Sequence, residues 1–195
     1  AYAYPLHERS AEAGYAALLS YVEYEKGMED EEAIKAWHQR YLDSGLRFGD
    51  TYPEHPESAA VLTTVAEDLF AQNQFDLAIA VGQTVVGRQP PVEATLARTS
   101  WTVIAHSQFD LGNFVEAERA YYSLRPLTPV DDTVATDEIK ERIASSIYKQ
   151  GEQARDAGDL ETAVTHFRRL GQAVPDSGFR ETAEYDAAAA LIAMG

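Results

Sequence analysis

The residue types that could carry chemistry in this chain are five histidines, a short acidic run and scattered serines. The histidines are His7, His38, His55, His106 and His166. A metal site on a helix commonly takes two ligands spaced three or four residues apart, and no two of these histidines have that spacing. His7 and His55 recur just before equivalent helices, which predicts a turn or capping role for both.

The remaining candidates give no stronger indication of a reaction. The run from Glu29 to Glu32 lacks the alternating oxygen ligands of a calcium loop, and carboxylates are stabilised at the start of a helix by its dipole. No serine stands in a nucleophile elbow, and no glycine-rich phosphate loop follows a strand. We therefore expect no catalytic residues, no bound metal and no cofactor.

Composition narrows the classes of partner. The chain has 195 residues, no cysteine and a net charge of −16. The missing cysteines exclude disulfides, thiolate metal sites and cysteine nucleophiles. An acidic surface repels nucleic acid and anionic lipid, and no apolar run approaches the roughly 20 residues of a membrane span. We expect neither nucleic-acid binding nor direct membrane insertion.

The segment from Trp101 to Pro129 predicts two helices joined by a tight turn. Trp101, Ile104, Ala105 and Gln108 recur at intervals of three or four, and Phe114, Ala117, Tyr121 and Leu124 form the stripe of a return helix. Gly112-Asn113 reverses the chain between them, because glycine tolerates the left-handed backbone that such a turn needs.

The same pattern recurs along the chain. Its turns fall at Asn73-Gln74-Phe75 and Gly158-Asp159-Leu160, and prolines end the units at 53, 90, 129 and 175. The segment from Tyr4 to Ala11 is echoed by that from Tyr52 to Ala59. The expected units are residues 9–53, 58–91, 98–130 and 137–176, with a partial unit at 178–195.

This pattern resembles the tetratricopeptide repeat, a helical hairpin of 34 residues. The resemblance implies an all-α fold, a right-handed α-α superhelix of about nine antiparallel helices with no β-sheet. We expect residues 1–195 to form one repeat domain. Because the last alanine-rich helix has no partner in sequence, we interpret the chain as a piece of a longer array whose exposed ends could self-associate. The alternative is a complete protein in which that helix caps the array.

A narrower resemblance is to bacterial cell-envelope repeat proteins of the BamD and CpoB type. It rests on the link from Phe167 to Ser177 followed by Ala183 and Tyr185, and on a looser instance from Phe48 to Pro56. It implies a periplasmic or outer-membrane-associated scaffold that binds a peptide or protein partner, with a cytoplasmic location as the alternative.

In this family the first helix of each hairpin lines a concave groove. The resemblance therefore implies a groove that contains the following residues: Thr63, Glu67, Phe70, Thr102, His106, Phe109, Tyr148, Glu152 and Arg155. Aromatic groups among hydrogen-bonding ones suit an extended peptide or a helix. The competing interpretation is that the aromatic residues only cover joints between neighbouring helices.

Two further alternatives concern the function of the repeats. Repeat domains that clamp a peptide carboxylate carry Lys and Asn at groove positions where this chain has Thr63 and Glu67, Thr102 and His106, and Tyr148 and Glu152. Glutamates there would repel a carboxylate, so we exclude that specialisation. The other alternative is that the repeats are a structural or regulatory spacer in a larger secretion or polysaccharide-export protein.

Overall fold

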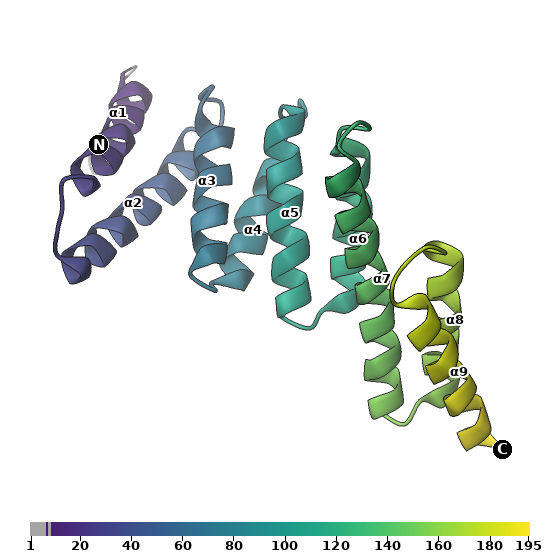
Figure 1. The fold of residues 1–195 in the computed structure, drawn as a ribbon. Coiled ribbons are helices and arrows are strands. Elements are labelled where there is room, and N and C mark those ends of the chain that lie inside the picture. The colour runs from purple at the N-terminus through teal and green to yellow at the C-terminus, as the bar shows by residue number, and fades with distance from the viewer. Residues whose placement is uncertain (1–6, 8) are drawn as a thin grey trace. The chain divides into compact units, whose positions relative to one another are not determined.

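The computed structural model describes His7 and residues 9–195. Every regular element in this part of the chain is helical, and it contains no strand (Figure 1). The helices are α1 (Ser10–Glu25), α2 (Glu31–Thr51), α3 (Ser58–Ala71), α4 (Phe75–Val86), α5 (Ala94–Asp110), α6 (Phe114–Leu124), the 3-10 turn η1 (Arg125–Leu127), α7 (Thr133–Asp156), α8 (Leu160–Ala173) and α9 (Arg180–Met194). Helix α7 is the longest of these helices, with 24 residues.

Three of the hairpins share one turn. The left-handed position is occupied by Asn73, Gly112 and Gly158, with φ of 59°, 76° and 83°. In each case the next residue donates its N–H to a carbonyl five residues back, at 2.9 Å. This pattern closes the carbonyl end of the first helix and directs the chain into the second. The predicted turns are therefore confirmed.

The two recurring histidines shape the entry to α1 and α3. The Nδ1 of His7 accepts the N–H of Arg9 at 3.3 Å, and the Nδ1 of His55 accepts the N–H of Glu57 at 3.2 Å. Their predicted turn role is confirmed. Residues Tyr4 and Pro5, which belong to the same echo in the sequence, lie outside the described residues.

The described residues form two compact units, divided between Leu96 and Ala97. In the first unit α1 packs on α2, α2 on α3 and α3 on α4; in the second, α6 packs on α7, α7 on α8 and α8 on α9. This succession of packed neighbours confirms the all-α fold expected from the sequence. The expectation that all 195 residues form one repeat domain stays a prediction.

Small residues allow the helices to approach closely. A Cβ atom on Gly151 of α7 would lie 2.4 Å from Cε1 of Phe167, whose ring is fully buried. Ala163 and Ala183 are likewise fully buried, on α8 and α9. Trp101 is only half-buried on α5. The core therefore depends on pairs of large and small side chains between successive helices.

No helix in the described part of the chain is both long and apolar enough to cross a membrane.

Candidate functional site

The predicted groove residues lie on three helices and divide between the two units. Three of them are on α3 in the first unit, and the other six are on α5 and α7 in the second. The structure therefore presents two separate sets of candidate residues.

The two threonines turn their hydroxyls back onto their own helices. Thr63 donates to the carbonyl of Ala59 at 2.9 Å, and Thr102 donates to that of Arg98 at 3.0 Å. Thr63 is only 3% exposed, so the expectation that it faces a partner is wrong. It belongs to the core because this stripe of α3 packs inward.

The two phenylalanines pack across the turns of their own hairpins. Phe70 lies 5.7 Å from Phe75 between ring centroids, and Phe109 lies 5.1 Å from Phe114. Both are half-buried. These contacts favour the competing interpretation, in which such rings cover the joints between helices.

His106 and Glu67 are affected by burial in different ways. The ring centroid of His106 lies 5.7 Å from that of Tyr121, and burial together with the positive charge of Arg142 lowers the pKa of His106. Glu67 is exposed as a whole on α3. Partial burial of its carboxyl, followed by the charge of the neighbouring Asp68, raises the pKa of that carboxyl.

Tyr148 is held firmly at the surface of α7. Its ring centroid is 5.4 Å from that of Phe167 and 5.6 Å from that of Phe179. Its hydroxyl donates to Oδ2 of Asp186 on α9 at 2.6 Å. Burial, followed by this hydrogen bond, raises the pKa of Tyr148 to about 12. The phenol therefore stays protonated and serves as a donor.

The other two candidates on α7 join the same cluster. Arg155 lies 3.5 Å from Asp186 and 3.6 Å from Glu152, measured between nitrogen and carboxylate oxygen. Glu152 also accepts from Lys149 at 2.7 Å. Tyr148, Glu152 and Arg155 are all partly exposed. The structure thus brings the three predicted α7 residues together, and Asp186 is the member that the sequence did not indicate.

A buried polar network connects α6, α7 and α8 and was not predicted. Glu118 is 7% exposed and receives two hydrogen bonds from Arg169, at 2.6 and 3.0 Å. Gln150 donates to the same carboxylate at 2.7 Å. A glutamate beside the apolar stripe of α6 was the only signal in the sequence, and it did not identify an arginine 51 residues away. Both oxygens of the Glu118 carboxylate accept hydrogen bonds within this network, which indicates a structural role.

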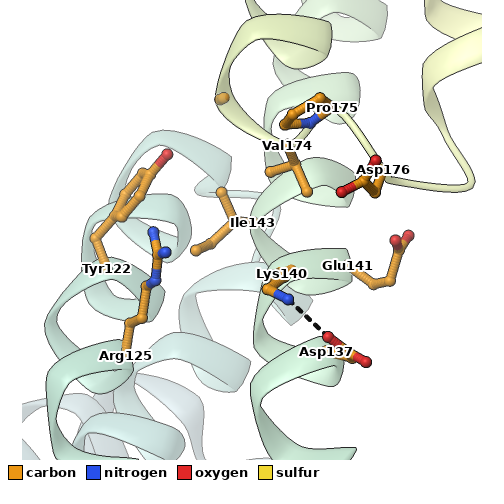
Figure 2. A pocket seen from close by; sticks show the side chains of 10 residues that line it. Tyr122, Arg125, Asp137, Lys140, Glu141, Ile143, Val174, Pro175 and Asp176 are labelled. Atoms are coloured by element: carbon orange, nitrogen blue, oxygen red, sulfur yellow. Dashed lines mark hydrogen bonds and ion pairs between the residues drawn. The ribbon is translucent and has the colours of Figure 1, made fainter. Parts of the chain in front are cut away.

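A cavity of about 500 Å³ opens on the second unit. Figure 2 shows Tyr122 and Arg125 on one side and Lys140 and Glu141 of α7 across from them. Lys140 pairs with Asp137 at 2.7 Å, and Glu141 accepts from the Ser177 hydroxyl at 2.9 Å. The charged groups on the α7 side therefore have partners within the unit.

Neither a metal-binding group of side chains in the described part of the chain nor a related sequence was found. Within the described residues, no three His, Cys, Asp or Glu side chains form a group that could hold a metal ion. Comparison of the sequence with protein-family models and with curated proteins gives no match.

Proposed function

We propose that this protein is a non-catalytic interaction scaffold that holds a peptide or protein partner on the first-helix face of its hairpins. The proposal gives the second unit the main role, with α7 at its centre. It places the protein in the tetratricopeptide-repeat superfamily and in the bacterial cell envelope, in assembly or export.

The observation that carries the proposal is the cluster on α7. Tyr148, Glu152 and Arg155 are spaced four and three residues apart, so they share one face of the helix. They offer both donors and acceptors at a partly exposed surface. This mixture can recognise the backbone and side chains of a bound segment.

The cluster is also preorganised. Tyr148 is fixed by two rings and by Asp186, and Arg155 is fixed by Asp186 and Glu152. Side chains that are already ordered lose less conformational entropy when a partner binds. A surface that served only to keep the molecule soluble would not need this order.

The proposed superfamily and envelope location start from the sequence. The turn positions, the proline links and the Phe167 to Ser177 link carry the resemblance. The three identical turns and the contact of Gly151 with Phe167 agree with a hairpin repeat.

The proposal can be tested by site-specific crosslinking in a bacterial envelope extract. A photoreactive benzoylphenylalanine would replace Glu152, and a matched control would carry it in place of Glu161, which is exposed on α8. We expect one defined protein to crosslink from position 152 and not from position 161. The captured protein, once purified, should bind wild type and lose affinity for Arg155→Ala. Equal crosslinking from both positions would contradict the proposal.

The second candidate function is a spacer segment of a larger secretion or polysaccharide-export protein. It is favoured by the internal pairing of Phe70 with Phe75 and of Phe109 with Phe114, which leaves these rings committed to the fold. Absence of any specific crosslink from position 152, together with an unfolding midpoint like that of wild type, would favour the spacer over the scaffold.

A further inference from the structure

The first unit contains a second cavity, which no predicted residue lines. It has a volume of about 450 Å³ and lies among α1, α2 and α3. Its walls combine apolar and acidic groups. The lining residues used in the argument below are Val22, Glu25, Ile34, His38, Tyr41 and Asp68. The three helices pack in succession within this unit, so the cavity belongs to a single compact body.

The two carboxylates of this cavity, Glu25 and Asp68, differ in their hydrogen bonding. The Nδ1 of His38 lies 3.1 and 3.2 Å from the two carboxylate oxygens of Glu25. The Nε2 of the same ring is 3.6 Å from Oδ2 of Asp68, which is beyond hydrogen-bond distance. Among the described residues, no group donates a hydrogen bond to the Asp68 side chain.

The environment of Asp68 penalises its negative charge. Burial is the main cause that raises the pKa of Asp68; nearby His38 opposes the rise, and Glu25 adds to it. A cation placed beside Asp68 would remove this penalty. Lys26 lies at the edge of the cavity, but its ammonium is paired with Glu23 at 2.6 Å.

Tyr41 supplies a polar group to the wall of this cavity, independently of the two carboxylates. The side chain is only 8% exposed and forms part of the cavity wall. Its hydroxyl has no hydrogen-bond partner in the part of the chain that the structure describes. Burial, with the charges of Asp68 and Glu25, raises the pKa of Tyr41, so the hydroxyl stays neutral and can accept from a ligand N–H. A hydroxyl on a largely buried side chain in the cavity wall, with no group of the described residues hydrogen-bonded to it, is available to a ligand N–H.

We propose that this cavity binds a lysine or arginine side chain from a segment of a partner protein. The aliphatic stem would lie against Val22 and Ile34, and the cationic head would meet Asp68, Glu25 and the Tyr41 hydroxyl. The chain carries a net charge of −16, which favours a basic partner. This inference rests on the proposed scaffold function and adds the charge of the bound segment.

The first test compares two probes on the wild-type chain. One is a fluorescein-labelled nonapeptide of glycine, serine and alanine with a single central arginine. The other has citrulline, the neutral isostere of arginine, at the centre. We expect the arginine peptide to bind about tenfold more tightly, as loss of one hydrogen-bonded charge pair implies. Equal binding of the two peptides would overturn the proposal.

Free agmatine, which carries the same guanidinium group without a peptide, distinguishes the source of the cation. We expect it to compete at least about tenfold more weakly than the arginine peptide, because it lacks the peptide backbone contacts. If agmatine binds as tightly as the peptide, the cavity takes a small cation and not a partner's side chain, and the proposal fails.

The second test uses matched variants. Asp68→Asn should weaken the arginine peptide by about tenfold, and Tyr41→Phe should weaken it by about threefold. Asp50→Asn is the control, because Asp50 is exposed on α2 outside the cavity and the variant makes the same change in net charge. Equal losses in Asp68→Asn and Asp50→Asn would mean that only the general acidity of the surface matters, which would overturn the site.

Nuclear magnetic resonance on wild type keeps the proposal testable if a variant misfolds. Titration with the arginine peptide should shift the ring signals of His38 and leave those of His166 in the second unit unchanged. Unshifted His38 signals at saturating peptide would overturn the proposal. Success of the crosslinking at position 152 with failure here would remove only this inference, whereas the reverse result would remove only the α7 site.

Discussion

The two units join their helices by different means. In the first unit α2 meets α3 through glycines: a Cβ atom on Gly49 would lie 2.4 Å from Cδ2 of Leu62, and one on Gly45 would lie 2.6 Å from Cγ2 of Val65. In the second unit α6, α7 and α8 meet around Glu118, which Arg169 and Gln150 bind at 2.6 and 2.7 Å. The α2–α3 contact, the apolar joint, depends on shape. The contact of α6, α7 and α8 around Glu118, the polar joint, depends on directed hydrogen bonds.

The difference predicts different sensitivities. A close apolar joint is stabilised by contact area and dispersion, so it responds to added volume and hardly to pH or salt. A buried ionic joint carries a desolvation cost that its hydrogen bonds offset, so it responds strongly when one partner is removed. Similar hairpins can therefore share one turn and still differ in what stabilises their packing.

The largest expected effect comes from removing the cation of the polar joint. Arg169→Ala leaves the Glu118 carboxylate buried with only Gln150 to satisfy it, and should lower the free energy of unfolding by about 3 kcal/mol at neutral pH. Urea unfolding measured by circular dichroism checks this. Arg168→Ala, at an exposed neighbouring position, should have little effect. Equal effects of the two variants would show that the polar joint is not important for stability.

The apolar joint should respond next. Gly49→Ala forces a methyl group against Leu62 and should cost about 2 kcal/mol of unfolding free energy. The matched control is Gly171→Ala, also near the end of a helix, where the nearest atom to an added Cβ is 3.8 Å away. That variant should instead gain up to about 1 kcal/mol from helix propensity. A neutral Gly49→Ala would mean that α2 and α3 can separate at no cost.

The smallest effects concern two aspartates, one in each unit, with opposite pKa shifts. Burial raises the pKa of Asp68, whereas hydrogen bonds from the side chain and backbone of Thr162 lower the pKa of Asp159 at the start of α8. A raised carboxyl pKa means that stability is lost as pH rises through the folded-state value. A lowered one means that stability is lost as pH falls through it.

Asp68→Asn should therefore leave the melting temperature at neutral pH unchanged or slightly raised, and Asp159→Ala should lower it. Both differences from wild type should shrink as the pH is lowered towards about 3, where carboxyls protonate. Thermal melts at several pH values measure this. A fall in melting temperature for Asp68→Asn at neutral pH would show that this carboxylate stabilises the fold, contrary to the strain inferred for it.

Most of the fold could be predicted from the sequence because its signals are local. The three hairpin turns follow from residues 73, 112 and 158, which either lack a Cβ or tolerate the left-handed region. The prolines at 53, 90, 129 and 175 all fall in links between helices. Helical periodicity and turn chemistry act over a few residues, so one sequence suffices to read them.

The candidate site could be predicted only in part. The family resemblance implied Tyr148, Glu152 and Arg155 of α7 by their positions, and the structure brings them together on one face, while their role in binding stays a prediction. The same carry-over by position included Thr63, which is buried, because position in a repeat does not fix which side of this largely apolar helix faces the core. It also could not show that Phe70 and Phe109 pack on their own hairpins.

What only the tertiary structure decided is which distant residues meet. Glu118 reaches Arg169 across 51 positions, Tyr148 reaches Asp186 across 38, and His38 reaches Glu25 across 13. The sequence by itself determined the helices, their turns and their order, since those depend on neighbours along the chain. The packing of one helix on the next set the polar partners, because rotating a helix by one residue would bring different side chains into contact.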